Sequence, residues 1–400
     1  MYCFRKVTED LYWVGGSDRR LELFENIFPL SKGVSYNSYL LMDEKTVLFD
    51  ATDHAIGRQF LENVKAVLNG RALDYLVVNH MEPDHCAMIE DLVLRYPDMK
   101  IIGNAKTFPM ISQFFDFDLE GKTVTVKEGD TFSCGAHTLH FVMAPMVHWP
   151  EAMMTYDEKD KVLFSADAFG TFGALNGNIF NDEVDFDREW LDEARRYYTN
   201  IVGKYGMQVQ NVLKKAAALD IQVICPLHGP IWRTDLDYII GKYDTWSKYE
   251  PEEKGVMIAY ASMYGNTENM AEIFAASLAE AGVKNIRMHN ISKTHVSELI
   301  SDSFKYSHIV LAAPTYNNGI YPLMDNYLED MKALALSNRT AAVLGNGTWA
   351  PQSTKLISAK ISEMKNMRLL ETSVTIKSAV KDSQMEEIGS LARQIAEEVL

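Results

Sequence analysis

Apolar positions in the first 250 residues alternate between a strand period and a helix period. The runs 34–42 and 45–50 predict a β-hairpin that turns at Asp43 and Glu44. The run Leu73–Asn79 predicts a strand that is buried on both faces of its sheet. We expect a second sheet from strands at 123–127, 138–143 and 162–165, and helices near 54–68, 86–96, 190–218 and 235–248. Two such sheets with helices outside them would form a four-layer αββα sandwich.

Residues 251–400 show a different alternation. Strand patterns at 255–262, 309–314 and 340–345 are each followed by a helical pattern, and the whole segment contains five strand–helix units. Because crossovers between parallel strands are right-handed, these units predict a doubly wound parallel sheet. We expect Asp382 and Ser383 to cap the final amphipathic helix.

The segment Glu250–Gly255 lies between the two patterns. It combines a proline, several charges and a glycine, which are typical of a domain boundary. We therefore expect one domain at residues 1–250 and another at residues 251–400.

Composition and charge narrow the possible environments and partners. The chain is 47% apolar, but no apolar run approaches about 18 residues, so we expect no membrane span. The first six residues are followed by the acidic Thr8–Asp10 and not by an apolar stretch, which predicts no export signal and a cytoplasmic location. A net charge of −16 opposes nucleic-acid binding, because that binding requires Lys and Arg to neutralise phosphates.

Metal-ligand residues are concentrated directly after the strand at 73–79. His80, Glu82, Asp84 and His85 lie within six residues, and His148, Asp167 and His228 follow downstream. A compact site holds four to six ligands, so seven candidates indicate two ions. A carboxylate between two histidines can bridge ions about 3.5–4 Å apart, and Asp167 has that position in the sequence.

Ligand type bears on the identity of the metal. In the zinc form of such a scaffold the third motif position is usually histidine, whereas this chain has Glu82. A carboxylate hardens the site and shifts its preference towards iron or manganese, although zinc also accepts carboxylates. The alternative is a polar loop with two hydrogen-bonded histidines, which the four matched spacings disfavour. The four cysteines include no Cys-x-x-Cys pair, so we expect no fused rubredoxin-like iron centre.

A second candidate site follows the strand at 255–262. Its loop, Ser262–Thr267, is rich in hydroxyl and glycine residues and opens a helix. Backbone amides at a helix N-terminus bind phosphate without lysine or arginine. The loop has neither a Gly-Lys-Ser/Thr ending nor a Gly-x-Gly-x-x-Gly pattern, so a mononucleotide is favoured over a magnesium-bound triphosphate or a dinucleotide.

Two later strand ends support the same site, since ligands of open α/β sheets bind at the carboxyl ends of strands. Tyr264, Tyr316 and Trp349 could stack on a flat ring, and the alternative for any one of them is a half-buried loop side chain. The expected cofactor-binding residues are Ser262, Met263, Tyr264, Gly265, Asn266, Thr267, Pro314, Thr315, Tyr316, Asn317, Asn318, Gly319, Asn346, Gly347, Thr348 and Trp349.

With these motifs the whole chain resembles the flavodiiron proteins. The resemblance is carried by His80-x-Glu82-x-Asp84-His85, His148-Trp-Pro, Ser165-Ala-Asp167, Cys225-Pro-Leu-His228 and the flavodoxin-type second half. It implies a metallo-β-lactamase-like domain with a non-haem diiron centre, followed by a flavodoxin-like domain with FMN. It also implies the reduction of dioxygen to water or of nitric oxide to nitrous oxide.

Further expectations follow from the resemblance. One iron would be held by His80, Glu82 and His148, the other by Asp84, His85 and His228, with Asp167 bridging them. Met81 and the third flavin loop, Asn346–Trp349, depart slightly from the family pattern. The expected electron donor is rubredoxin or a reduced deazaflavin, and the expected assembly is a head-to-tail homodimer or a homotetramer.

Two other functions are compatible with parts of the sequence. The first is a zinc-dependent hydrolase of the metallo-β-lactamase fold fused to a flavodoxin module, for which Glu82 is the weak point. The second is a flavin electron carrier with a vestigial metal domain, which the intact set of seven ligands disfavours.

Overall fold

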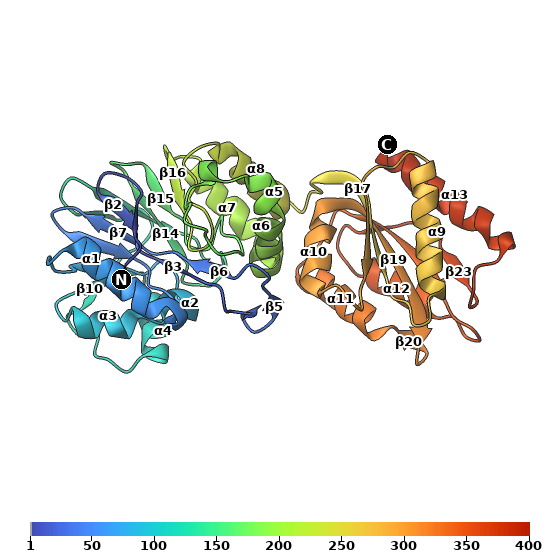
Figure 1. Cartoon of the computed structure of the whole chain (residues 1–400), viewed down its shortest axis with the longest axis horizontal. Helices are drawn as coiled ribbons and strands as arrows, with labels where there is room; N and C mark the ends of the chain where they lie inside the picture. Colours follow the sequence, from blue (N-terminus) through green and yellow to red (C-terminus); the bar gives the residue numbers. More distant parts are fainter. Residues whose placement is uncertain (1) are drawn as a thin grey trace. The chain divides into compact units, whose positions relative to one another are not determined.

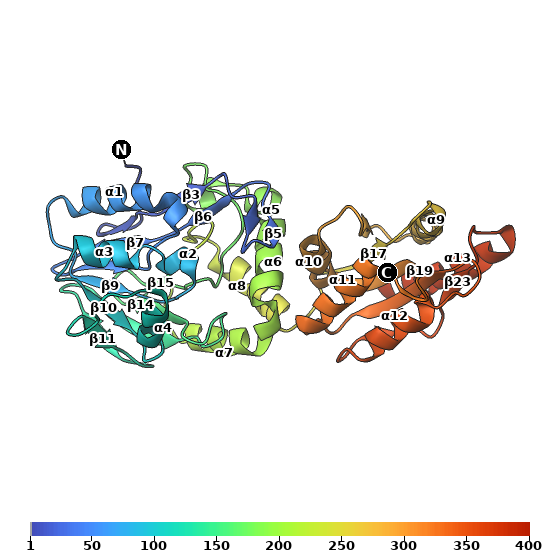
Figure 2. The same cartoon turned by 90° about the horizontal axis from the view of Figure 1, so that it is seen from below.

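The computed structural model describes residues 2–400, which divide into two compact units. The N-terminal unit runs to Tyr198 and includes Met207–Asp244, and the C-terminal unit comprises Thr199–Gly206 and Thr245–Leu400. Figure 1 follows the chain through both units, and Figure 2 shows the same cartoon turned by 90°. Among the described residues, no helix is long and apolar enough to cross a membrane.

Two facing sheets form the centre of the N-terminal unit. The seven-stranded sheet has the order β1-β2-β7-β8-β9-β10-β11, and the five-stranded sheet has the order β12-β13-β14-β15-β16. The strands of the larger sheet are β1 Arg5–Lys6, β2 Leu11–Trp13, β7 Tyr39–Met42, β8 Thr46–Phe49, β9 Tyr75–Val77, β10 Lys100–Gly103 and β11 Thr123–Thr125. Those of the smaller sheet are β12 Thr131–Ser133, β13 Thr138–Met143, β14 Met153–Asp157, β15 Val162–Phe164 and β16 Val223–Cys225.

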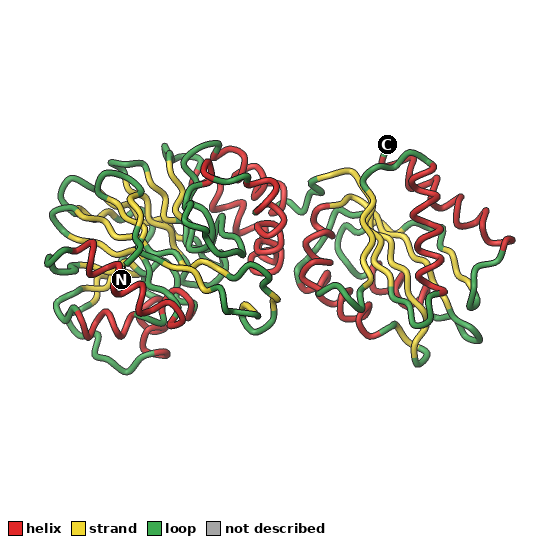
Figure 3. The backbone as a smooth tube through the Cα atoms, in the orientation of Figure 1, coloured by secondary structure: helices red, strands yellow, loops and turns green. Residues whose placement is uncertain are grey.

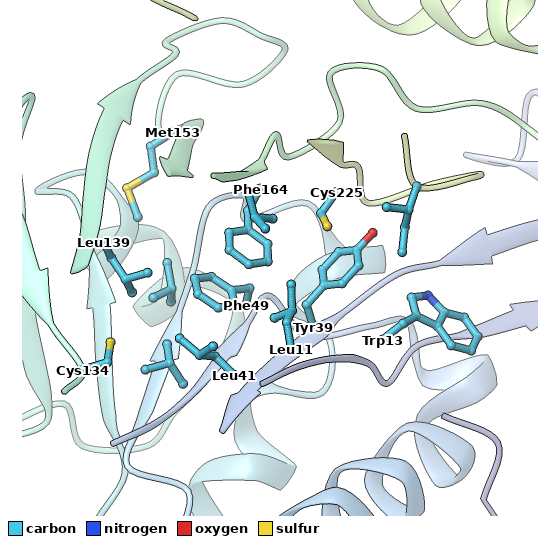
Figure 4. Packing of buried hydrophobic residues seen from close by; sticks show 14 of the residues in the cluster. Leu11, Trp13, Tyr39, Leu41, Phe49, Cys134, Leu139, Met153, Phe164 and Cys225 are labelled. Atoms are coloured by element: carbon cyan, nitrogen blue, oxygen red, sulfur yellow. The ribbon is translucent and has the colours of Figure 1, made fainter. Parts of the chain in front are cut away.

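The main core of this unit lies between the two sheets. Phe49 of β8 stacks on Phe164 of β15, with ring centroids 3.7 Å apart and planes 9° from parallel. Figure 4 shows this pair with Tyr39 and Cys225, which come from different sheets. Aromatic pairs of this kind add to the stability that apolar burial supplies, so the two sheets are held against each other at this point.

Helices cover the outer faces of both sheets. A second core lies between the larger sheet and the helices α1 Gly57–Leu68, α3 Ile89–Arg95 and α4 Thr107–Phe114. A 3₁₀ turn, η1 His54–Ile56, directly precedes α1. Figure 1 shows a second group of helices beside β14–β16, comprising α5 Phe186–Glu189, α6 Leu191–Tyr197, α7 Gly206–Ala216 and α8 Leu236–Ser247. A 3₁₀ turn, η2 Asn181–Glu183, precedes α5. The four-layer αββα sandwich expected from the sequence is therefore present.

Three details of the first 250 residues differ from the sequence-based expectation. The strand at 123–127 belongs to the larger sheet, because β11 pairs in parallel with β10 across the α4 crossover and does not join the other sheet. Only β7 and β8 form the hairpin, because β6 Val34–Tyr36 pairs with β3 Gly16–Asp18 in a separate ribbon. The single helix expected at 190–218 is interrupted by a π-helical turn, Tyr198–Val202, and a 3₁₀ turn, Gly203–Tyr205.

The C-terminal unit is a doubly wound sheet. Its order, β18-β17-β19-β21-β22, is parallel throughout, with β23 also pairing in parallel with β21 and β20 antiparallel to the end of β19. The strands are β17 Glu253–Tyr260, β18 Ile286–Asn290, β19 Tyr306–Tyr316, β20 Gly319–Ile320, β21 Thr340–Asn346, β22 Arg368–Leu369 and β23 Val374–Ile376. In chain order this is the 2-1-3-4-5 arrangement of flavodoxin-like sheets.

Helices lie on both faces of this sheet, as Figure 3 shows. The helices α9 Asn266–Glu280 and α13 Asp382–Val399 bury apolar residues against one face, and Figure 1 shows α10 Val296–Lys305, α11 Pro322–Ala333 and α12 Ser353–Ser362 on the other. Asp382 is the first residue of α13 and not its N-cap, which is Lys381. The Gln384 side chain accepts a hydrogen bond of 2.9 Å from the Lys381 amide, so Gln384 satisfies an amide at this helix end.

Candidate metal centre and cofactor pocket

The contiguous ligand motif leaves β9 and enters a short helix. Pro83 is the first residue of α2, Pro83–Cys86, where its missing N–H costs nothing, and Glu82 precedes the helix in an extended conformation. The carboxylate of Asp50 accepts hydrogen bonds from the amides of Asn79 at 2.7 Å and His80 at 3.1 Å, which fixes the start of the loop. Burial raises the pKa of Asp50 to about 6.

Four side chains converge in a first group, which consists of His80, Glu82, His148 and Asp167. Nε2 of His148 lies 2.9 Å from Oε2 of Glu82 and 3.1 Å from Oδ2 of Asp167. Nε2 of His80 lies 3.3 Å from the same Glu82 oxygen and 3.4 Å from the same Asp167 oxygen. Two imidazoles and two carboxylates therefore point at one small volume.

A second group consists of Asp84, His85 and His228. Oδ2 of Asp84 lies 3.3 Å from Nε2 of each histidine, and the two Nε2 atoms are 3.1 Å apart. Nδ1 of His228 lies 2.7 Å from the carbonyl oxygen of Ser35. This contact makes Nδ1 the protonated nitrogen, so Nε2 presents its lone pair to the group.

Asp167 faces both groups with different oxygens. Its Oδ2 lies near the histidines of the first group, whereas its Oδ1 is 3.1 Å from Nε2 of His85 and 3.8 Å from Nε2 of His228. Asp167 follows β15 in a tight turn in which Ala166 and Phe169 have positive φ angles of 50° and 68°. This conformation is strained for residues other than glycine, as is common where a site imposes its geometry on the chain.

Buried carboxylate oxygens that accept no hydrogen bond indicate whether these residues fit metal ions. Both carboxylate oxygens of Asp84 and Oδ1 of Asp167 are buried and accept no hydrogen bond. All seven side chains of the two groups are buried. Buried anions require a compensating positive charge, so this donor set fits two cations that share Asp167.

The C-terminal unit has a pocket of about 510 Å³ at the carboxyl ends of β17, β19 and β21. It brings together fourteen of the sixteen residues expected from the sequence, and it also includes Ala350 and Ser378. Gly265 and Gly319 do not line it. Its lining residues are Ser262, Met263, Tyr264, Asn266, Thr267, Pro314, Thr315, Tyr316, Asn317, Asn318, Asn346, Gly347, Thr348, Trp349, Ala350 and Ser378.

The loops of this pocket suit a phosphate at one end and a flat ring at the other. Gly265 has a φ of +87° directly before α9, whose first-turn amides have no carbonyl partner within the helix. The side chains of Tyr264 and Trp349 are 91% and 86% exposed, so neither ring is covered by the chain's own atoms. Asn346 joins the loops, because its Nδ2 donates to Oγ1 of Thr267 at 3.2 Å and to the carbonyl of Ser378 at 2.9 Å.

Comparisons with known proteins match both units. The family model described as ODP family beta lactamase matches residues 34–229, and the flavodoxin model matches residues 258–389. The anaerobic nitric oxide reductase flavorubredoxin of Vibrio vulnificus is 32% identical to this chain, over 93% of this chain and 74% of that protein. The chain belongs to the flavodiiron protein family.

Two further proteins are similar to almost the whole chain. The structure of rubredoxin oxygen:oxidoreductase from Desulfovibrio gigas superposes with a TM-score of 0.92 at 29% identity, over 99% of this chain and 98% of that one. An uncharacterised protein of Methanocaldococcus jannaschii is 28% identical over 98% of both chains. The family resemblance and the fold class expected from the sequence are confirmed, and the chain is an oxidoreductase of the flavodiiron type.

Family membership also bears on the cofactors and on the alternatives. FMN and a non-haem diiron centre are the cofactors of flavodiiron proteins, and the pocket and the two ligand groups fit them. These relatives do not favour the alternative function, a zinc-dependent hydrolase of the metallo-β-lactamase fold. A vestigial metal domain is also disfavoured, because all seven candidate ligands point into one region.

Several residues beside the ligands of this flavodiiron site are not marked by any motif in the sequence. Glu151 contacts His80 and Met81 through a single oxygen, although it lies 71 positions from His80. The hydroxyl of Tyr197 is buried without a hydrogen-bond partner, and its ring lies 5.4 Å from that of His228. Burial raises the pKa of Tyr197, and the nearby carboxylate of Asp167 raises it further. These contacts join distant segments, and only the folded chain shows them.

Glu25 is a further residue that the sequence did not single out. It lies with a φ of 50° in the turn between β4 Leu23–Phe24 and β5 Phe28–Pro29. The residue as a whole is exposed, but its carboxyl group approaches Glu82. Partial burial of the carboxyl group and the charge of Glu82 raise the pKa of Glu25 to about 8. The turn therefore brings an additional carboxyl group to the edge of the first ligand group.

Proposed function

We propose that this chain reduces dioxygen to water, nitric oxide to nitrous oxide, or both, at two iron ions, with electrons relayed through FMN from an external carrier. The observation that carries the proposal is the position of Asp167, whose two oxygens face two separate groups of histidine and carboxylate ligands. A centre of two redox-active ions suits the multi-electron reduction of a small gas.

We assign His80, Glu82 and His148 to one iron and Asp84, His85 and His228 to the other. Asp167 would be shared by the two ions in this assignment, and the distances within each group support it. When bound, the iron ions supply coordination positions for the gas, and FMN supplies one-electron transfer. We further propose that residues 1–250 carry the metal centre, that residues 251–400 carry FMN, and that the protein acts in the cytoplasm.

Aromatic side chains shield the His228 side of the centre from water. The rings of Phe24 and Tyr36 lie 5.5 and 5.8 Å from the His228 ring, and Phe172 packs on both Phe24 and Tyr197. Within this apolar surrounding, the buried Tyr197 hydroxyl is a donor with no other partner. We infer that it donates a hydrogen bond towards the reacting gas, where low polarity strengthens the interaction.

The pocket residues divide between the two ends of FMN in this proposal. The amides of Asn266 and Thr267 would bind the phosphate, since they lie in the first turn of α9. Tyr264 and Trp349 would flank the ring. Asn346 would position the surrounding loops through its bonds to Thr267 and Ser378, so it acts on the flavin indirectly.

We propose a rubredoxin or a reduced deazaflavin as the donor and a head-to-tail homodimer, or a homotetramer built from two such dimers, as the assembly. The Desulfovibrio gigas relative is named for rubredoxin, which supports the first donor. Met263, Tyr264 and Trp349 line the pocket and are exposed, so they form an apolar patch at its edge of the kind that a second copy of the chain would cover. A protein that is monomeric by light scattering during full turnover would refute the dimer.

The first test is the metal and flavin content of the purified protein. The proposal requires two irons and one FMN per chain, and reduced protein that is reoxidised by dioxygen or by nitric oxide in separate anaerobic mixing experiments. Zinc without iron, after anaerobic expression with iron supplied, would instead support the hydrolase alternative. That outcome would direct the next assays to esters and lactams.

The variant Asp167→Ala tests the bridging role. Loss of the shared carboxylate should abolish the paired metal and gas reduction while FMN binding is retained, because the pocket lies in the other unit. Asp91→Ala, which removes an exposed carboxylate from α3, is the matched control. Unchanged oxidase and nitric oxide reductase activities in Asp167→Ala would contradict the diiron proposal.

A further inference from the structure

The two ligand groups are equivalent in residue type. Each has two imidazoles and one carboxylate of its own, Glu82 in the first group and Asp84 in the second, and both share Asp167. If only these direct ligands mattered, the two ions would have nearly the same electron density. A difference between the ions must therefore come from the groups behind the ligands.

The groups behind the ligand rings are not equivalent. Nδ1 of His80 lies 2.9 Å from Oε1 of Glu151, a carboxylate whose residue is only 1% exposed. Nδ1 of His228 meets the neutral carbonyl of Ser35, and Nδ1 of His85 is buried with no hydrogen-bond partner. The contacts of His148 with Glu82 and Asp167 are made by Nε2, so within residues 2–400 His80 is the only ligand histidine with a described contact between Nδ1 and a carboxylate.

Glu151 is held in place by its other contacts. The same Oε1 accepts the amide of Met81 at 2.8 Å, and the backbone carbonyl of Glu151 accepts Nδ2 of Asn104 at 2.6 Å. Since Oε1 accepts from both, Nδ1 of His80 carries the ring proton, and the lone pair of Nε2, which lies beside Glu82 and Asp167, is available to a cation held between them. Glu151 thus joins the loop of His80 to the segment that follows His148.

We propose that Glu151 makes the two ions inequivalent. A carboxylate that accepts the N–H of a ligand imidazole increases the basicity of that ligand. His80 is therefore a stronger electron donor than the other three rings, and the ion at His80, Glu82 and His148 is bound more tightly and oxidised more readily than its neighbour. The inference rests on the proposed diiron ligand set, and it makes Glu151 a positioning and tuning residue, because it contacts His80 and not the ions.

The variant Glu151→Gln tests the inference at constant side-chain size. The amide oxygen still accepts the Met81 amide, but the negative charge behind His80 is lost. We expect the affinity for the more tightly bound metal to fall by about 10- to 100-fold in competition with a chelator. We also expect the maximum yield of the mixed-valent state, followed by electron paramagnetic resonance during reductive titration, to fall because the two potentials approach each other.

Glu158→Gln is the matched control. It removes the carboxylate that lies 3.1 Å from Nε2 of His140, a similar pair at the protein surface that belongs to neither ligand group. Metal affinity and mixed-valent yield should stay at the wild-type values in this variant. If both variants changed these readouts equally, a general charge effect would explain the result and the inference would be overturned.

The wild-type protein supplies a readout that does not depend on the folding of the variant. Mössbauer spectra of the protein loaded with ⁵⁷Fe should show two unequal iron environments, and a single environment would overturn the inference. Two bound irons with identical behaviour in wild type and Glu151→Gln would also overturn it while the proposed function stands. Failure of the wild type to bind paired iron would instead contradict the proposed function.

Discussion

Gly229 gives a quantitative test of how tightly the backbone around His228 is packed. Its φ is +77°, and a Cβ at this position would lie 2.1 Å from Cγ2 of Thr171, which is itself buried. Its amide also donates to Oγ of Ser35 at 2.7 Å, beside the carbonyl that orients His228. Alanine at residue 229 should therefore disturb both the packing and the ligand.

Two terms set the expected cost of Gly229→Ala. A left-handed conformation costs a residue with a Cβ roughly 1–2 kcal/mol. Forcing a methyl group into a filled site costs about 1–3 kcal/mol more. The free energy of unfolding of the N-terminal unit should thus fall by about 2–5 kcal/mol.

A second substitution separates the two terms. Thr171→Ser removes the clashing Cγ2, keeps the hydroxyl that donates to the carbonyl of Phe172, and leaves the nearest remaining atom of residue 171 at 3.4 Å. The double variant should then retain only the conformational cost of about 1–2 kcal/mol. Thr171→Ser alone should cost about 1 kcal/mol for one buried methyl group.

Urea unfolding followed by tryptophan fluorescence is a suitable assay. Four of the six tryptophans, Trp13, Trp149, Trp190 and Trp232, lie in the N-terminal unit, while FMN fluorescence would report on the other unit. Metal affinity measured on the same proteins would show whether His228 is displaced. A Gly229→Ala variant within about 0.5 kcal/mol of wild type, or a double variant as unstable as the single one, would refute this reasoning.

Two further predictions concern the buried side chains of Tyr197 and His137. Tyr197→Phe removes the unpartnered hydroxyl and keeps the ring packing on Phe172, so it should slow gas reduction while leaving the metal content unchanged. Equal turnover in the wild type and the variant would exclude the hydroxyl from the reaction. His137 is buried with Nδ1 2.9 Å from the Asp157 carboxylate, and although burial acts to lower its pKa, that hydrogen bond raises it overall. A raised folded-state pKa stabilises the protein below the unfolded value of about 6.5, and this stabilisation is lost as the pH rises through the folded-state pKa. His137→Asn should therefore cost more stability at about pH 5.5 than at about pH 9 in urea titrations, and a cost that is independent of pH would contradict the assignment.

The sequence predicted those parts of the site in which neighbouring residues act together. His80 to His85 follow a buried strand, so their convergence could be expected from the strand end alone, and the same holds for Ser262–Thr267 before α9. Asp167 was expected to bridge because it is a lone carboxylate between histidines, and its two oxygens do face the two groups. The assignment of individual ligands to iron stays a prediction.

The missed features depend on contacts between distant segments. Edge strand β11 has three residues, and nothing in so short a segment indicates which sheet it joins. The helix expected at 190–218 continues its apolar pattern through the π-helical turn, so periodicity alone could not locate the interruption. Glu151 and Tyr197 gain their positions beside the ligands from folding across many intervening residues.

The two-sheet core has a consequence for the reactivity of the metal centre. His80 and its neighbours follow β9 of the larger sheet, whereas Asp167 and His228 follow β15 and β16 of the smaller one. The spacing between the two ligand groups is therefore a property of how the sheets are aligned, and the stacked pair Phe49 and Phe164 in Figure 4 helps to set that alignment. Close-packed interiors transmit strain, so substitutions of these rings would retune the reaction without touching a ligand. Selection for gas chemistry can in this way act on residues that look purely structural.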